Sequence, residues 1–237
     1  MKKSLLVVAA FAALSVSATA QVLIASSFEA PTFATGALAG QDGWTGNANY
    51  SVVNDFAKTG TQSVRWLGTG GTYVWKPIAP AYSGTNTVVS KVSIFIDPQT
   101  ANADRTFGLR YWGNIGGIGL TVNSAGLVRA SENYGTLWGG TGVGSISNAT
   151  GRWLDLEISY ALGSSVASVK VDTFSTVVSV SGGLTSLDDV DFFSDWDALN
   201  ANNTAWFDDF SVEAVPEPAT MTLLALGAIA ARRRKKA

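Results

Sequence analysis

The 237-residue chain contains no cysteine and no histidine. The absence of both residues excludes disulfide bonds and the Ser-His-Asp and Cys-His systems of nucleophilic catalysis. It also removes the usual side-chain ligands of structural zinc, haem and iron–sulfur clusters. Any functional site must therefore be built from other groups, chiefly carboxylates and aromatic rings.

The formal charge of −2 is low because two cationic ends offset an acidic interior. The ends contribute seven Lys and Arg residues, whereas residues 21–215 carry 9 basic and 17 acidic residues, which gives 9 − 17 = −8. Binding to a nucleic-acid backbone requires clustered Lys and Arg. The interior therefore argues against a nucleic-acid partner.

The N-terminus has the pattern of a secretory signal peptide over Met1–Ala20. Two lysines follow the first residue, Leu5–Leu14 is an apolar run, and Ala18–Ala20 supplies a small-x-small cleavage site. The alternative is a short buried helix at the start of the fold. The order of the three parts favours export, with a mature chain that begins at Gln21.

The C-terminus carries three further signals in order. Pro216-Glu217-Pro218 interrupts regular structure, and Met221–Ala231 is largely apolar or small but shorter than the about 20 residues of a full membrane span. The chain then carries the cations Arg232, Arg233, Arg234, Lys235 and Lys236, which favour a cytoplasmic end. An amphipathic or unstructured tail is the alternative.

Residues 215–237 resemble the PEP-CTERM sorting signal of Gram-negative bacteria. The resemblance implies the secretion machinery and an exosortase as partners, with the exosortase acting near the Pro-Glu-Pro tripeptide. It also implies transient anchoring in the inner membrane through the C-terminal segment, followed by delivery to the cell surface or extracellular matrix.

Between these signals, residues 21–214 are predicted to form one all-β domain. Short runs rich in Val, Ile, Thr and aromatics alternate with Gly, Asn and Ser turns, as in sandwiches and barrels. In Thr87–Ile96 and Trp153–Tyr160 the aliphatic residues recur at every second position, which predicts strands with one buried face. The acidic segment Asp188–Asn200 is predicted to be a loop or short helix held by its aromatics.

A second resemblance spans most of this domain. Ser27–Glu29, Gly43-Trp44, Lys58–Val64, Trp153–Leu156 and Ala205–Val212 follow one another as in the jelly-roll domains of extracellular carbohydrate-binding modules and laminin G/concanavalin-like lectins. The resemblance implies a jelly-roll β-sandwich of two antiparallel sheets. We expect a signal helix before it and a hydrophobic helix after it.

The same resemblance implies a structural Ca²⁺ ion where the first and last strands meet. Its ligands would be Glu29, Asp208 or Asp209, and backbone oxygens of Lys58–Gly60. Strict alternation would place Asp208 and Asp209 on opposite faces, so that only one could reach the site. The alternative is that both aspartates solvate the end of a strand.

Glycoside hydrolysis needs two carboxylates on either side of the scissile bond. Asp155-Leu156-Glu157 is similar to the end of the Glu-x-Asp-x-Glu strand of laminarinase-like sandwiches, but Trp153 stands where that motif has its first Glu. The incomplete motif predicts a protein that is not an enzyme. A divergent glycosidase that uses Glu132 with Glu157 is the alternative.

Sugar binding is the stronger hypothesis, because aromatic rings stack on sugars and polar groups bind their hydroxyls. Tyr111, Trp112 and Asn114 lie beside glycine, as do Tyr134 and Trp138. The alternative for each ring is core packing. The sequence thus predicts an exported, non-catalytic surface or matrix protein that binds extracellular polysaccharide, with a purely structural surface protein as the alternative.

Overall fold

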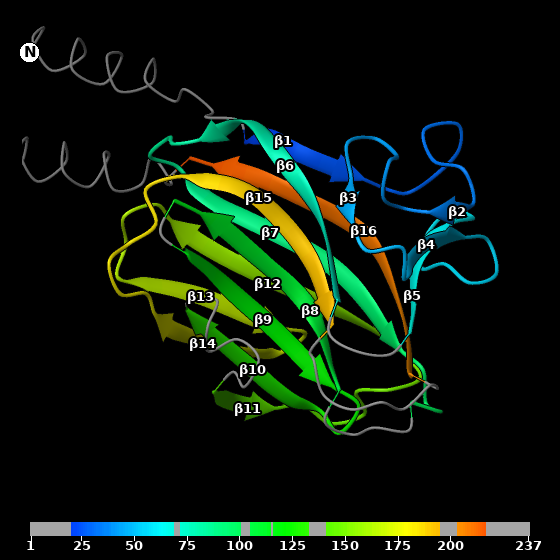
Figure 1. Cartoon of the computed structure of the whole chain (residues 1–237). Helices are drawn as coiled ribbons and strands as arrows, with labels where there is room; N and C mark the ends of the chain where they lie inside the picture. Colours follow the sequence, from blue (N-terminus) through cyan, green and yellow to red (C-terminus); the bar gives the residue numbers. More distant parts are fainter. Residues whose placement is uncertain are drawn as a thin grey trace, which may run out of the picture.

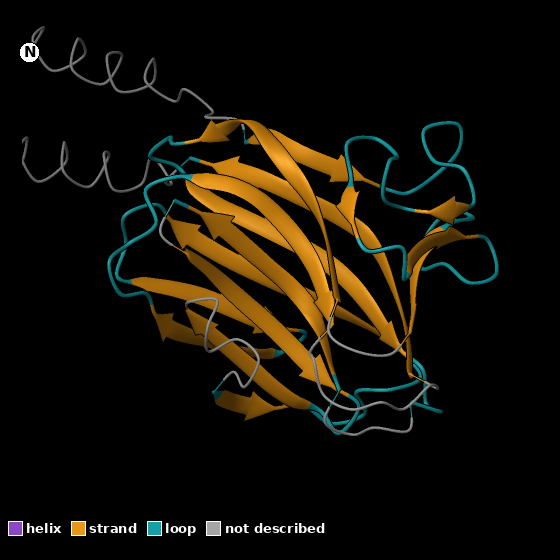
Figure 2. Ribbon diagram, in the orientation of Figure 1, coloured by secondary structure: helices purple, strands orange, loops and turns teal. Residues whose placement is uncertain are grey.

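The computed structural model describes residues 20–68, 72–100, 105–114, 116–132, 141–194 and 203–216. Within these ranges every helix-or-strand assignment is a strand, and the strands form two antiparallel sheets packed face to face (Figures 1 and 2). This confirms the predicted all-β jelly-roll sandwich. The two predicted flanking helices lie outside the described residues.

Sheet A has the order β14-β13-β12-β7-β16-β5-β4-β2, and β1 pairs with β16 beside β5. Sheet B has the order β11-β10-β9-β8-β15-β6-β3. The strands of sheet A are β1 (Gln21–Ser26), β2 (Gly36–Ala37), β4 (Tyr50–Val53), β5 (Ser63–Gly68), β7 (Thr87–Ile96), β12 (Trp153–Ala161), β13 (Val166–Val171), β14 (Phe174–Ser179) and β16 (Asn203–Val215). Those of sheet B are β3 (Thr45–Gly46), β6 (Thr72–Tyr82), β8 (Thr106–Gly113), β9 (Gly116–Asn123), β10 (Leu127–Glu132), β11 (Gly142–Ser145) and β15 (Leu187–Ser194).

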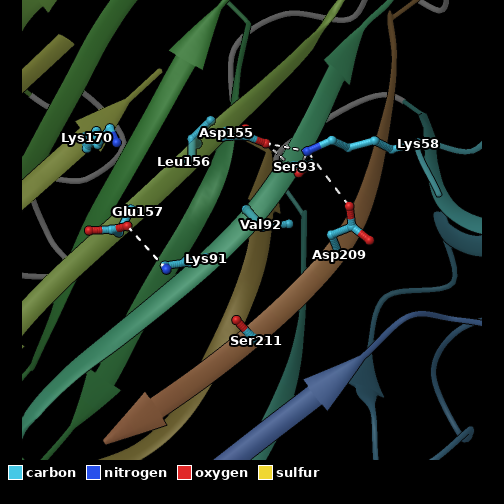
Figure 3. A pocket seen from close by; sticks show the side chains of 10 residues that line it. All are labelled: Lys58, Lys91, Val92, Ser93, Asp155, Leu156, Glu157, Lys170, Asp209 and Ser211. Atoms are coloured by element: carbon cyan, nitrogen blue, oxygen red, sulfur yellow. Dashed lines mark hydrogen bonds and ion pairs between the residues drawn. The ribbon is translucent and has the colours of Figure 1, made fainter. Parts of the chain in front are cut away.

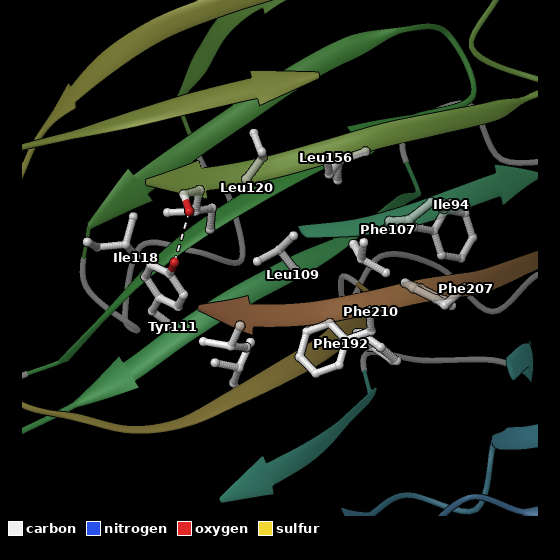
Figure 4. Packing of buried hydrophobic residues seen from close by; sticks show 14 of the residues in the cluster. Ile94, Phe107, Leu109, Tyr111, Ile118, Leu120, Leu156, Phe192, Phe207 and Phe210 are labelled. Carbon is white, nitrogen blue, oxygen red and sulfur yellow. Dashed lines mark hydrogen bonds between the residues drawn. The ribbon is translucent and has the colours of Figure 1, made fainter. Parts of the chain in front are cut away.

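The core fills the space between the sheets (Figure 4). Alternate residues of β7 and β12, such as Ile94 and Leu154, are fully buried, as their periodicity predicts. Phe192 of sheet B stacks on Phe207 of sheet A with ring centroids 4.8 Å apart. Each sheet therefore buries one face and leaves the other for function.

The acidic segment near residue 190 is a strand, so the prediction of a loop or short helix over Asp188–Asn200 is wrong for its described part. Strand β15 pairs with β6 on one side and β8 on the other, in the interior of sheet B. Val190 and Phe192 point into the core, whereas Asp189 and Asp191 line a pocket on the outer face. Inward apolar residues thus alternate with outward aspartates, which is the pattern of a strand with a carboxylate-bearing outer face.

Strand β16 contains a bulge at the position of its two consecutive aspartates. The pairing with β7 shifts between Asp208 and Ser211, and Asp209 has a φ of 50°. Phe207 and Phe210 are both buried as a result, although strict alternation would place them on opposite faces. The prediction that only one of the two aspartates can serve a given site is therefore wrong, because both contact the same turn.

No helix among the described residues is long and apolar enough to cross a membrane.

Candidate functional site

The outer face of sheet B carries a pocket of about 340 Å³ with three half-buried or exposed aromatic rings. Strands β6, β8 and β15 contribute its walls and floor. We call this surface the aromatic face; its lining residues are Tyr73, Trp75, Arg110, Trp112, Asp189 and Asp191.

Strand register explains why these side chains meet. Asp191 is the cross-strand partner of both Trp75 and Arg110, and Asp189 is that of Trp112. Because residues in register point to the same side of a sheet, an aromatic-x-aromatic pattern on β6 and an acidic-x-acidic pattern on β15 converge on one surface. Tyr73 follows at the next outward position of β6, with its ring centroid 5.4 Å from that of Trp75.

A buried ion pair forms the floor of the aromatic face. Arg110 Nε donates to Asp191 Oδ2 at 2.9 Å, and Nη2 donates to the same carboxylate. The side chains are only 5% and 2% exposed. The guanidinium carbon also lies 5.4 Å from the ring centroid of Trp112 and 5.5 Å from that of Tyr73. The pair therefore holds two of the rings in place by cation–π contact.

The two carboxylates of the aromatic face have raised pKa values. Burial raises the pKa of Asp189 to about 6, against the opposing effect of Arg110 and with a smaller contribution from Asp188. Burial likewise raises the pKa of Asp191 to about 7, although the Arg110 guanidinium opposes the shift. Asp189 therefore changes its charge between pH 5 and pH 7 at the edge of an aromatic pocket.

Glycine in β9 lets the Trp112 ring lie close to the sheet. Gly117 is the cross-strand partner of Trp112, and a Cβ at this glycine would lie 2.9 Å from the Cε3 atom of the ring. The same Cβ would lie even closer to the backbone oxygen of Tyr111, so a larger residue would clash with both the strand and the indole. Gly117 thus helps to shape the aromatic face.

The predicted sugar-binding residues separate in the structure. Trp112 lies on the aromatic face, but Tyr111 is 1% exposed and donates its hydroxyl to Ile158 O at 2.9 Å, which places it in the core. Asn114 Oδ1 accepts a hydrogen bond from the backbone N–H of Thr185 at 3.0 Å and so links the end of β8 to the segment before β15. Burial removes Tyr111 as a stacking platform.

Tyr134 and Trp138 lie outside the described residues. Sequence reasoning missed Tyr73, Trp75 and Arg110. The available signal was Tyr73-Val74-Trp75, an alternation of polar aromatics around one aliphatic residue, which is typical of a strand with an aromatic outer face.

The carboxylates proposed as calcium ligands are occupied by N–H donors. Glu29 Oε1 accepts from the backbone of Thr61 and Gln62, both at 2.8 Å, and Asp208 Oδ2 accepts from Lys58 N at 2.8 Å. Burial raises the pKa of Glu29, but these donors outweigh it and the net shift is downward. The turn at residues 58–62 thus presents N–H groups, not carbonyl oxygens, to these carboxylates.

Asp209, the remaining predicted calcium ligand, lies beside the ammonium group of Lys58 (Figure 3). Lys58 Nζ lies 3.8 Å from Asp209 Oδ2 and 2.7 Å from Asp155 Oδ1, and Thr59 Oγ1 donates to Asp209 at 2.5 Å. The described residues contain no group of three or more acidic side chains placed to hold a metal. Since Ca²⁺ takes about 6–8 oxygen ligands, these residues do not fit the predicted calcium site.

Carboxylates of the outer face of sheet A are also paired. Asp155 accepts from Lys58 and from Ser93 Oγ at 2.7 Å, and Glu157 lies 3.8 Å from Lys91. Burial raises the pKa of Asp155, but the two hydrogen bonds and the Lys58 charge give a net downward shift.

The alternative glycosidase pair is divided between the two sheets. Glu132 is the last residue of β10 in sheet B and accepts from Ser181. Glu157 instead lines a groove on the outer face of sheet A, together with Lys58, Asp155 and Asp209 (Figure 3). Glu132 is not among the residues that line that groove. The two carboxylates therefore do not converge on one bond.

The predicted sorting signal begins where the sheet ends. Strand β16 ends at Val215, and Pro216 follows directly. Glu217, Pro218 and the C-terminal cations lie outside the described residues.

Comparison with known proteins identifies the sorting signal and the fold. Residues 214–236 match the PEP-CTERM protein-sorting motif. The chain thus carries the motif of an exported protein that is sorted through the membrane to the cell surface. No curated protein matches the chain in sequence.

Solved structures show the same fold at low identity. One is the carbohydrate esterase of the Shiga toxin-encoding bacteriophage phi24B, with a TM-score of 0.57, 13% identity and coverage of 83% of this chain and 100% of that chain. Another is the cellulose-induced protein Cip1, with a TM-score of 0.51, 14% identity and coverage of 82% and 98%. The CBM22-1 xylan-binding domain from Paenibacillus barcinonensis Xyn10C is a more distant match, with a TM-score of 0.45, 15% identity and coverage of 84% and 98%, and the fold assignment does not depend on it.

Proposed function

We propose that the chain is a non-catalytic, exported protein that binds extracellular polysaccharide through the aromatic face. The observation that carries the proposal is the convergence of three aromatic rings with a buried Arg–Asp pair and a further carboxylate around one pocket of about 340 Å³. Ligand sites typically combine apolar walls with a few placed polar groups. Here the polar groups lie at the floor and the rings around it.

Each part of the aromatic face has a role in this proposal. Trp75 and Trp112 offer ring surfaces to the C–H face of a sugar, in the offset stacking that rings favour. Asp189 accepts hydrogen bonds from sugar hydroxyls, since no group of the described residues donates to its carboxylate. Asp191 is already bound by Arg110 and keeps the site rigid, so the face lacks the two opposed free carboxylates of a glycosidase.

The role of Asp189 predicts a pH dependence. A carboxylate with a pKa of about 6 is only roughly one-tenth ionised at pH 5 and mostly ionised at pH 7.5. Because the ionised form is the better acceptor, polysaccharide affinity should rise up to about tenfold over this range. Titration calorimetry of the wild type at several pH values measures the effect.

Asp189→Asn is the matched variant for this experiment, because it keeps the size of the side chain and cannot titrate. Its affinity should be lower than that of the wild type at pH 7.5, and its pH profile should be clearly shallower, because only Asp191, with a pKa of about 7, still titrates on this face. An equally steep pH profile in Asp189→Asn would assign the dependence to another group.

The sorting motif supports a proposed route to the surface. An exosortase processes the chain near Pro216 after the signal peptide directs export and the C-terminal segment anchors it in the inner membrane of a Gram-negative-type cell. The mature domain then remains at the cell surface or in the extracellular matrix, where polysaccharide is available.

Replacing residues 216–218 with alanines should leave full-length protein in the membrane fraction, because the exosortase no longer finds its tripeptide. Mass spectrometry of membrane and extracellular fractions measures the processing. A control with Thr220→Ala, two residues beyond the tripeptide, should be processed normally. Unchanged mass and location of the tripeptide variant would refute processing at this motif.

A further inference from the structure

A second, uncharged groove lies beside the two ends of the domain. It has a volume of about 440 Å³ and is lined by residues 21–23 of the first strand and residues 78–84 of β6 and the turn after it. None of their side chains carries a charge, although a mature chain that begins at Gln21 would place its α-amino group here. Val22 is 59% exposed, and Ala79, Pro80 and Ala81 are exposed as well. The groove thus exposes apolar side chains at Val22 and Ala79–Ala81 beside the polar residues Gln21, Tyr82 and Ser83.

Both ends of the chain leave the fold beside this groove. Gln21 pairs with Ala214, and Val215 pairs with Thr87 at the start of β7. Figure 1 shows the start of β1, the end of β6 and the end of β16 together at one end of the sandwich. The segments with membrane-directed sequence patterns therefore attach at the end of the domain that carries the groove.

The length of the connection limits how far this end can lie from a membrane. Only residues 216–220 separate β16 from the apolar segment that starts at Met221. Five fully extended residues span at most about 17 Å. While the C-terminal segment is in the bilayer, the groove must therefore stay within reach of the headgroup layer.

From these observations we propose that the groove is a membrane-contact surface, which rests on the bilayer interface while the chain is anchored by its C-terminal segment. The proposal rests on the sorting motif and is independent of polysaccharide binding. Its occupant is the headgroup and glycerol layer, into which Val22 and the Ala79–Ala81 segment insert. Since none of the lining side chains is charged, the contact depends on the exposed apolar side chains and not on pairing with anionic lipid.

The absence of cysteine makes a direct test simple, because one introduced cysteine gives one labelled site. The full chain is prepared as Val22→Cys and, as a matched control, as Leu67→Cys. Leu67 is 49% exposed and pairs with Thr204, eleven residues from the end of β16, so it lies about 35 Å away along the strand. Both variants receive an environment-sensitive fluorophore and enter phosphatidylcholine vesicles that contain a headgroup-attached nitroxide lipid.

The vesicle-bound fraction of each variant is isolated by flotation before measurement. The label at position 22 should be quenched at least about threefold more strongly than the label at position 67, because interfacial contact brings it within about 5–10 Å of the quencher layer. Adding phosphatidylglycerol or salt should leave the ratio unchanged. Circular dichroism checks that both labelled variants are folded.

Equal quenching at the two positions would overturn the proposal. The proposal would also be contradicted if quenching at position 22 decreased as more protein was bound per vesicle. That result would show that a second copy of the chain, and not lipid, covers the groove. A ratio that rises only with phosphatidylglycerol would likewise contradict an apolar contact.

Discussion

Replacing Trp112 with alanine is expected to weaken polysaccharide binding by about 2 kcal/mol, or roughly 30-fold, because the change removes a central ring of the aromatic face. Trp75→Ala should have a similar effect, since its ring lies on the neighbouring wall of the same pocket. Removing both rings should abolish retention in affinity electrophoresis. Titration calorimetry with the retained polysaccharide gives the single-variant losses.

Trp153→Ala is the matched control. Trp153 is also half-buried, but it lies on the outer face of sheet A, where its ring stacks on Phe56 with centroids 5.5 Å apart. Its loss should lower thermal stability and leave affinity within about twofold of wild type. Equal losses of affinity in Trp112→Ala and Trp153→Ala would show a general effect on the fold and would contradict the assignment of the site.

Replacing Arg110 with leucine is expected to lower the free energy of unfolding by about 3–5 kcal/mol. The substitution leaves the Asp191 carboxylate, whose side chain is 2% exposed, without its ion-pair partner. Asp191 then takes up a proton more readily, so its pKa rises further and the loss should be smaller at pH 5 than at pH 8. Urea unfolding at the two pH values measures both effects.

The double variant Arg110→Leu, Asp191→Leu separates the missing partner from the missing packing. With no buried charge left, it should recover most of the stability lost in the single variant. It should still bind polysaccharide weakly, because the guanidinium that orders Tyr73 and Trp112 is gone. A double variant as unstable as Arg110→Leu would show that the pair acts only through packing.

Much of the fold follows from short-range pattern in the sequence. The aliphatic alternation in Thr87–Ile96 and Trp153–Tyr160 predicts two strands that each bury one face, and the structure pairs these strands directly in sheet A. A pattern of period two fixes which side chains are buried, because successive side chains of a strand point to opposite faces. The fold class can therefore be predicted from the local alternation of aliphatic and polar residues.

The aromatic face depends on strand order and pairing register, which cannot be predicted from the local sequence pattern. Tyr73, Arg110 and Asp191 are far apart in the chain and meet only because β15 lies between β6 and β8. A bulge near Asp209 also changes the face of every following residue in β16, and nothing in the local pattern marks it. The carboxylates of β15 resembled a solvated loop because their buried cation is 81 residues away.

Because the chain has no histidine or cysteine, the proposed function uses aromatic rings and carboxylates, and these converge on the aromatic face. Its most direct test is fluorine NMR of protein labelled with 5-fluorotryptophan, titrated with a panel of soluble polysaccharides. At least one polysaccharide should shift the resonances of Trp75 and Trp112. It should leave in place those of Trp153 and of Trp206, whose ring lies beside Phe56 on the outer face of sheet A as that of Trp153 does. No shift with any polysaccharide, or shifts confined to Trp153 and Trp206, would contradict the proposed site.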